Sequence, residues 1–241
     1  MKRCFYVIVL LFCFLFARFD FIYADGIGRP WNALWIGPKN DKGTEYGVYY
    51  FRKSITIKEK LESFNIHVSA DNRYKLFVNG KVVSMGPARG DTYFWNYETV
   101  DIAPYLVSGN NCIAALVWNE AEYRPEAQIS IRTAFILQGN SEKEEILNSN
   151  ETWKCIQDKG YQPIPGYFFA ATKGQLVDMA KTVKGDWTSA SFDDSNWPNA
   201  VKILEGNLKG KSDGLAWQLV PSILPQMELT YQRIPKLRWA K

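Results

Sequence analysis

Apolar and polar side chains alternate with a period of two along much of this chain, a pattern typical of β-strands that bury one face. The alternation is clear in Phe64–Val68 and again in Tyr74–Val78. Asn79 and Gly80 separate the second run from Lys81–Val83. An Asn-Gly pair at this position predicts a β-hairpin, because both central residues of a type I′ turn need a positive φ.

Further strands are predicted at intervals of about ten residues, with turn residues between them. No window has the period of a long amphipathic helix, and one short helical turn is expected at Ala103–Leu106, where Asp101 can cap it. This spacing indicates an all-β sandwich or barrel. The further strand candidates are Tyr46–Ile57, Tyr97–Ile102, Asn111–Asn119, Gln128–Gln138, Thr152–Ile156 and Gln175–Met179.

The N-terminal residues 1–24 have the pattern of a secretion signal. Lys2 and Arg3 precede the apolar run Cys4–Ala17, which is too short to cross the roughly 30 Å core of a bilayer as a helix. Cleavage after Ala24 would give a secreted or periplasmic protein with no membrane association. A signal anchor is the alternative, because Phe16–Tyr23 is still fairly apolar.

Composition excludes several classes of function. The 241 residues are 46% hydrophobic and 15% aromatic, which fits a folded domain rather than a disordered chain. A net charge of +4 is too weak to indicate a nucleic-acid partner, and a single histidine, His67, rules out a multi-histidine zinc site. The chain has no P-loop, GxGxxG, CxxC or GxSxG motif. No cofactor and no metal site are therefore predicted.

Two cysteines, Cys112 and Cys155, remain once residues 1–24 are removed. An exported protein could pair them in a disulfide. Cys112 lies in an apolar strand, however, where a thiol often packs as a small buried hydrophobic group. Both alternatives stay open at the level of sequence.

Two polar and aromatic clusters are candidates for carbohydrate contact. The first, residues 86–97, contains two glycines and a proline and is expected to be a loop. The second, residues 118–126, follows a predicted strand directly, so both could lie at one rim of a sheet. Planar polar groups can pair with sugar hydroxyls, and flat rings can carry the C–H face of a sugar. The candidate ligand-binding residues are Arg89, Asp91, Trp95, Trp118, Asn119, Glu122 and Arg124.

Each candidate also has a structural alternative. Arg89 and Asp91 could brace their own loop, and the two tryptophans could belong to the core or to an interface. Glu122 and Arg124 could pair with each other or dock on another domain. No acidic pair can be chosen as catalytic, because sequence does not place two carboxyl groups at the required separation of roughly 5–9 Å.

The runs VSADNRYKLFVNGKVVSMGPARGD, residues 68–91, and YETVDIAPYLVSGNNCIAALVWN, residues 97–119, resemble a known family. They are similar to the N-terminal galactose-binding-like domain of bacterial α-L-rhamnosidases, which is a jelly-roll β-sandwich. The segment Trp31–Trp35 and the turn Phe192–Trp197 also fit this family. The resemblance covers roughly Pro30 to Pro235.

In that family the domain precedes a catalytic (α/α)6 barrel, which supplies the acidic residues that cleave terminal rhamnose with inversion. No catalytic residue can be carried over, because the sequence given stops before such a barrel. The resemblance implies a non-catalytic accessory region whose partners are a rhamnose-containing glycan and a glycosidase catalytic domain. The expected organisation is a signal peptide (1–24), a sandwich (25–220) and a linker toward a catalytic domain (221–241). A purely structural domain is the main alternative, and an enzyme in its own right is a third.

Overall fold

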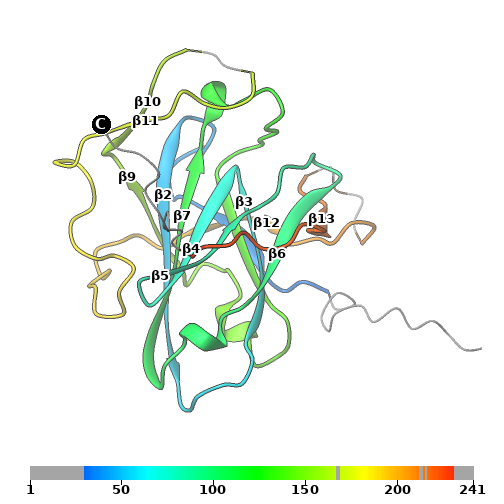
Figure 1. Ribbon diagram of the computed structural model, residues 1–241, viewed down its shortest axis with the longest axis vertical. Helices are drawn as coiled ribbons and strands as arrows, with labels where there is room; N and C mark the ends of the chain where they lie inside the picture. The colour runs from blue at the N-terminus through cyan, green and yellow to red at the C-terminus, as the bar shows by residue number, and fades with distance from the viewer. Residues whose placement is uncertain (1–29, 167–168, 212–213, 215, 231–241) are drawn as a thin grey trace, which may run out of the picture.

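Two β-sheets packed face to face make up the body of the molecule (Figure 1). The computed structural model describes residues 30–166, 169–211, 214 and 216–230. Within these ranges the chain is nearly all β, which confirms the predicted sandwich. The predicted signal, residues 1–24, lies outside the described residues.

One sheet is centred on two strands of 11 residues each, β2 (Gly47–Ile57) and β7 (Gly109–Asn119). They pair antiparallel along their whole length, with Gly47 opposite Asn119 at one end and Ile57 opposite Gly109 at the other. The strand order is β5-β4-β7-β2-β9. The remaining strands of this sheet are β4 (Arg73–Val78), β5 (Lys81–Gly86) and β9 (Lys154–Asp158).

The predicted Asn-Gly hairpin joins β4 to β5. Asn79 and Gly80 have φ values of 49° and 83°, as a type I′ turn requires. The Asn79 side chain also ties the turn to the neighbouring strand. Its Oδ1 accepts the backbone N–H of Cys112 at 2.9 Å, and its Nδ2 donates to the backbone carbonyl of Tyr105 at 2.9 Å.

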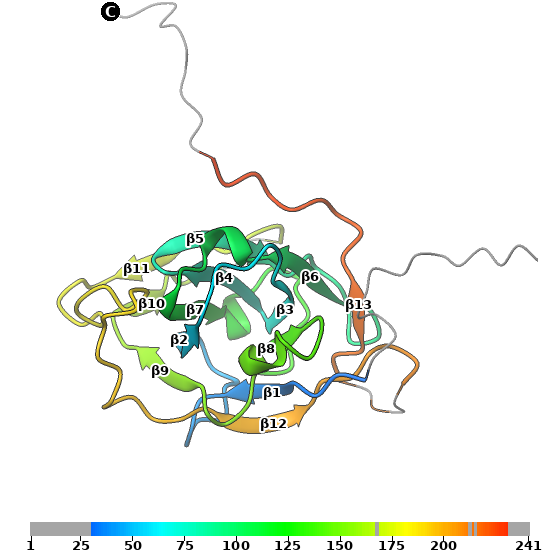
Figure 2. The same ribbon diagram turned by 90° about the horizontal axis from the view of Figure 1, so that it is seen from below.

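The second sheet has the strand order β12-β1-β8-β3-β6-β13. Its pairs are antiparallel except for β13, which runs parallel to β6. In Figure 2, β5 and β12 lie at opposite edges of the two layers. The strands are β1 (Leu34–Gly37), β3 (Asn65–Asp71), β6 (Trp95–Asp101), β8 (Ala134–Gly139), β12 (Val201–Glu205) and β13 (Leu219–Pro221).

A two-stranded hairpin, β10 (Tyr161–Pro163) with β11 (Gln175–Val177), lies at the upper end of the molecule in Figure 1. The predicted helical turn is the 3₁₀ helix η1 (Ala103–Tyr105), where the Asp101 carboxylate accepts the backbone N–H of Ala103 at 3.0 Å. The other 3₁₀ helices are η2 (Ala121–Tyr123) and η3 (Glu145–Leu147). No helix in the described ranges is long and apolar enough to cross a membrane.

Apolar side chains form three layers, because both outer faces of the sandwich are also covered. The central layer lies between the sheets. One outer face is covered by residues 183–197, and the other is covered by residues 206–211 and 216–219. Each layer has an aromatic pair: Phe51 and Phe135 between the sheets at 5.3 Å between ring centroids, Trp35 stacked on Trp217 at 4.6 Å, and Tyr50 stacked on Trp187 at 4.0 Å.

Arg52, on β2, fastens the covering segment 183–197 to its sheet. The Arg52 side chain is 1% exposed and forms an ion pair with the carboxylate of Asp194. Its Nε donates to the carbonyl of Trp187 at 3.0 Å, and its Nη2 donates to the carbonyl of Ser189 at 2.6 Å. A buried charge is tolerated only when it is paired and hydrogen-bonded in this way. Asp194 is therefore a structural residue of this turn.

The expectation of one long strand over Gln128–Gln138 is wrong in its first half. The strand is Ala134–Gly139, and Ile129 and Ile131 are 40% and 38% exposed. The buried carboxylate of Asp71 explains the difference. It accepts the backbone N–H of Ile131 at 2.6 Å and the Ser130 hydroxyl at 2.7 Å, so the backbone here turns toward a side chain instead of toward a neighbouring strand.

The two cysteines are free and buried. Cys112 lies opposite Ser54 on one side of β2, and Cys155 lies opposite Phe51 on the other side. Burial raises the pKa of Cys112 to about 11 and the pKa of Cys155 well above its usual range. The sequence left open whether these cysteines form a disulfide or remain as buried thiols, and the structure shows buried thiols.

His67 is a core residue of β3, 2% exposed. Its Nδ1 lies 2.9 Å from the Thr99 hydroxyl and its Nε2 lies 3.0 Å from Asn140 Oδ1. Burial lowers the pKa of His67, which favours the neutral ring. The single histidine of the chain therefore has a packing role here.

The segment after β13 stays on the sandwich as far as Gln226. The Ser222 N–H donates to the carbonyl of Tyr97 at 2.9 Å. Gln226 accepts the Ser84 hydroxyl at 3.2 Å and donates to the Glu98 carboxylate at 3.1 Å. The first part of the predicted linker thus contacts the domain, and residues 231–241 lie outside the described part of the chain.

Candidate functional site

The first candidate cluster is largely occupied in supporting its own loop. Arg89 and Asp91 are exposed between β5 and β6, and the Asp91 carboxylate accepts the backbone N–H groups of Tyr93 and Phe94 at 2.8 and 2.9 Å. Trp95 is 3% exposed and packs edge-on against Trp217. Asp91 thus braces its own loop and Trp95 belongs to a buried layer, which are the structural alternatives to ligand binding. The ligand-binding role of both residues stays a prediction.

In the second cluster, Asn119 and Arg124 brace the turn that carries Glu122. Asn119 is 1% exposed; its Oδ1 accepts the N–H of Ala121 at 2.8 Å, and its Nδ2 donates to the carbonyl of Gly43 at 2.9 Å. Arg124 Nη1 donates to the carbonyl of Ala121 at 2.6 Å. Ala121 has a φ of 46°, a left-handed conformation that is costly without glycine. The two side chains thus fix a strained turn.

The two clusters meet at Glu120. This carboxyl group is half-buried, and burial raises its pKa while the nearby charges of Arg89 and Arg73 act to lower it. Trp118 is half-buried on β7, opposite Val48, and packs on the apolar layer beneath residues 183–197. The charge of Arg89 thus acts on Glu120, which is part of the second cluster, while Trp118 faces the covered side.

A hollow of about 550 Å³ opens beside Glu122, and we call it the tyrosine hollow. Tyr46 and Tyr123 meet edge to face there, with ring centroids 6.2 Å apart. Burial raises the pKa of Tyr46 to about 12, and a hydrogen bond with Glu122 raises the pKa of Tyr123. The hollow is lined by Thr44, Glu45, Tyr46, Ala121, Glu122, Tyr123, Tyr161 and Pro163.

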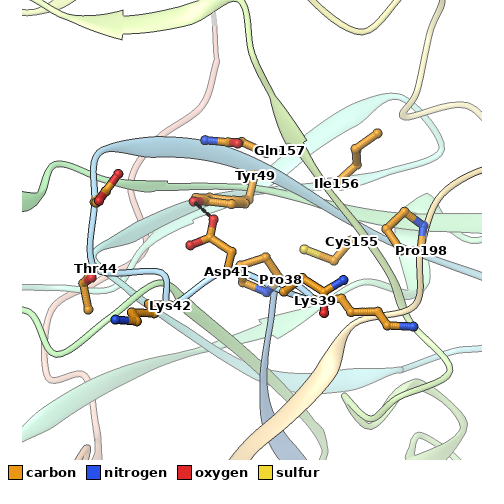
Figure 3. Close-up of a pocket in the computed structure, with 12 residues that line it drawn as sticks. Pro38, Lys39, Asp41, Lys42, Thr44, Tyr49, Cys155, Ile156, Gln157 and Pro198 are labelled. Atoms are coloured by element: carbon orange, nitrogen blue, oxygen red, sulfur yellow. Dashed lines mark hydrogen bonds between the residues drawn. The ribbon is translucent and has the colours of Figure 1, made fainter.

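A second hollow, of about 410 Å³, adjoins the first, and we call it the loop hollow (Figure 3). Figure 3 shows Asp41 directed at Tyr49, whose hydroxyl donates to Asp41 Oδ2 at 2.6 Å. Thr44 and Lys42 lie on one side of the hollow and Cys155 and Pro198 on the other. It is lined by Pro38, Lys39, Asn40, Asp41, Lys42, Thr44, Glu45, Tyr49, Cys155, Ile156, Gln157 and Pro198.

The loop between β1 and β2, residues 38–46, separates the two hollows. Its Gly43 has a φ of 68°, and a Cβ there would lie 3.2 Å from the backbone nitrogen of Thr133. The carbonyl of Gly43 accepts the N–H of Thr133 at 2.7 Å and the side-chain amide of Asn119 at 2.9 Å. The loop is thus anchored from two directions, while Thr44 and Glu45 project between the hollows and line both.

Sequence reasoning missed this loop. Its signal was present, since KNDKGTEYG, residues 39–47, is a polar stretch between two apolar runs. Nothing local connects it to residues 118–126, however, because that contact depends on the pairing of Gly47 with Asn119. Of the seven candidates, Glu122 is the one that lines a hollow of this rim.

The rim combines hydrogen-bonding groups with aromatic faces. Carboxylates accept hydrogen bonds, amide and ammonium groups donate them, and the tyrosine rings offer flat apolar faces with polar ends. Among the described residues, no group of three His, Cys, Asp or Glu could hold a metal ion. The arrangement suits an uncharged ligand rich in hydroxyl groups.

Comparison with known proteins agrees with this architecture. The model of the α-L-rhamnosidase N-terminal domain family matches residues 59–223. An α-L-rhamnosidase of Formosa agariphila is 26% identical over an alignment of 176 residues, and the match covers 63% of this chain and 17% of that protein. An α-L-rhamnosidase of Streptomyces avermitilis is 25% identical over 152 residues, 63% of this chain and 12% of that protein. Among solved structures, a GH78 family rhamnosidase of Bacillus sp. GL1 has a TM-score of 0.70 and 27% identity, covering 83% of this chain and 20% of that one.

The all-β sandwich is therefore a domain of the kind found in a glycoside hydrolase. The chain belongs to the α-L-rhamnosidase N-terminal domain family, because the family model matches more than half of its residues. It spans a fifth or less of the length of these rhamnosidases.

Proposed function

We propose that this chain is a non-catalytic accessory region of an α-L-rhamnosidase-type glycoside hydrolase and that its rim contacts rhamnose-containing glycans. The observation that carries the proposal is the tyrosine hollow, where Tyr46, Tyr123 and Tyr161 lie beside Glu45 and Glu122. Its volume of about 550 Å³ falls in the range of small-ligand sites, roughly 300–1,000 Å³. The family match and the names of the relatives support the choice of glycan.

Family membership also supports a glycosidase catalytic domain as partner, and the pattern of residues 1–24 supports an exported location, secreted or periplasmic. The proposed organisation remains a signal peptide, a sandwich over 25–220 and a connecting segment from 221. No catalytic residue is proposed in this chain.

Calorimetric titration of the full chain with rhamnose and rhamnose-capped oligosaccharides tests the proposal. We expect a millimolar or tighter Kd, and we expect Tyr123→Ala to weaken binding about tenfold, equivalent to about 1.4 kcal/mol, because it removes an aromatic face. Val107→Ala is the control: Val107 is 54% exposed between η1 and β7, outside both candidate clusters and the hollow, and its loss should leave Kd unchanged. An absence of heat with every glycan at millimolar concentration would remove the binding proposal.

A structural role is the second candidate, and one observation favours it. The segment after β13 carries apolar side chains in solvent, with Ile223 94%, Leu224 61% and Met227 55% exposed. An exposed apolar strip of this kind is typical of a surface that another domain covers. In that role the domain would pack on the catalytic domain and position it.

A further inference from the structure

The two hollows form one continuous rim, because Thr44 and Glu45 line both. They lie at the same end of the sandwich: Gly47 at the start of β2 pairs with Asn119 at the end of β7, and Tyr49 pairs with Gln157 near the end of β9. At about 550 and 410 Å³, each is large enough for a small ligand. The residues 44–45 thus form a ridge with a site on each side.

The two sides offer different chemistry. The tyrosine hollow provides three phenol rings, which favour contact with the face of a sugar ring. The loop hollow provides hydrogen-bonding groups, with Asp41 as acceptor and Gln157 and Lys39 as donors. A single sugar would use one set of contacts, whereas two linked sugars would use both.

Charge favours a neutral ligand over an anionic one. In the loop hollow, Lys39 and Lys42 are balanced by Asp41 and Glu45. In the tyrosine hollow, Glu45 and Glu122 are both acidic, and no Lys, Arg or His is among the described residues that line it. A uronic acid or a sulfated sugar would meet like charge there, which is destabilising.

Asp41 is held in place before any ligand arrives. Its Oδ1 accepts the N–H of Gly43 at 2.7 Å, and its Oδ2 accepts the hydroxyl of Tyr49 at 2.6 Å. Tyr49 is itself 1% exposed, so its position is fixed by packing. A carboxylate has about four lone-pair sites, so these two bonds leave acceptor capacity toward the hollow. Preorganisation of this kind lowers the entropy cost of binding.

We infer that the rim binds a neutral oligosaccharide of at least two sugars laid across the ridge of Thr44 and Glu45. One sugar stacks in the tyrosine hollow, and the next hydrogen-bonds to Asp41 and Gln157 in the loop hollow. This inference rests on the proposed function and extends it from a single sugar to a chain.

Calorimetry on the full chain with rhamnose and with neutral rhamnose-capped di- and trisaccharides tests the inference. We expect the oligosaccharides to bind about tenfold more tightly than rhamnose. Asp41→Asn and Gln157→Ala should each weaken oligosaccharide binding by about three- to tenfold, the effect of one lost hydrogen bond, and should leave rhamnose binding unchanged. Gln162→Ala is the matched control, because Gln162 is an exposed glutamine of β10 that lines neither hollow.

The outcomes separate this inference from the proposed function. Suppose that Tyr123→Ala weakens binding but oligosaccharides bind no better than rhamnose. Binding across the ridge of Thr44 and Glu45 is then wrong, and the single-sugar site stands. The same conclusion follows if Asp41→Asn and Gln157→Ala both bind oligosaccharides like the wild type. A disaccharide with a uronic acid as the sugar that enters the tyrosine hollow should bind more weakly than its neutral counterpart, because Glu45 and Glu122 line that hollow; equal or tighter binding would overturn the neutral assignment. No binding of any glycan overturns both proposals.

Discussion

Replacing Arg52 by methionine is expected to lower the free energy of unfolding by about 3–5 kcal/mol, the usual cost of removing one partner of a buried ion pair. Methionine keeps much of the apolar stem, so the loss reports mainly on the guanidinium. That group pairs with Asp194 and donates to the carbonyls of Trp187 and Ser189. Urea unfolding followed by tryptophan fluorescence measures the change.

Two controls define the origin of this loss. Lys202→Met breaks the exposed pair of Lys202 with Glu205, whose side chains are 43% and 57% exposed, and should cost no more than about 1 kcal/mol. The double variant Arg52→Met with Asp194→Asn should cost less than the sum of the two single changes, because the residues interact directly. Equal losses for Arg52→Met and Lys202→Met would show that the buried pair does not hold the covering segment.

Replacing Asp71 by alanine is expected to cost about 4 kcal/mol or more, since each buried donor left without a partner costs about 1–3 kcal/mol. Asp71 is 0% exposed. Its carboxylate accepts hydrogen bonds from Ser130, Ile131 and Arg132 and from the side chains of Asn72 and Trp217. The substitution therefore loosens both the loop at 130–132 and the outer apolar layer in which Trp217 stacks on Trp35.

The isosteric variant Asp71→Asn separates hydrogen bonding from packing. It keeps the volume and one carbonyl acceptor, so we expect an intermediate loss between the wild type and Asp71→Ala. Amide hydrogen exchange should show faster exchange at Ile131 and Arg132 in both variants, because their N–H groups donate to this carboxylate. Unchanged stability in Asp71→Ala would contradict the role assigned to it.

The sequence was most informative where a strand is long or a turn needs one residue type. The β2 and β7 strands have 11 residues each, so alternation is unambiguous, and Asn79-Gly80 specifies its own turn. The strands β1, β10, β12 and β13 have three to five residues, too few for a period to emerge. Each is defined by the strand it pairs with: β12 by β1, β1 also by β8, β13 by β6, and β10 by β11.

The candidate site was harder to predict, because sequence gives the type of a residue but not the direction of its side chain. The cluster at 118–126 was found from its composition, yet Asn119 points inward to brace a turn while Glu122 lines a hollow. The partner loop at 38–46 lies more than seventy positions away, and it joins the rim through the pairing of Gly47 with Asn119 and the hydrogen bond from Asn119 to Gly43. Its Asp41 had no local signal that set it apart from other acidic residues.

The most direct test of the central claim, that this end of the sandwich recognises a glycan without cleaving it, is amide chemical-shift mapping by NMR. The full chain would be titrated with a rhamnose-capped oligosaccharide. We predict shifts in residues 38–46, 121–123, 156–157 and 161–163, with no release of free rhamnose. Shifts centred on the apolar segment 223–229, or no shifts at all, would contradict the claim. Release of rhamnose by a preparation free of contaminating glycosidase would contradict it as well.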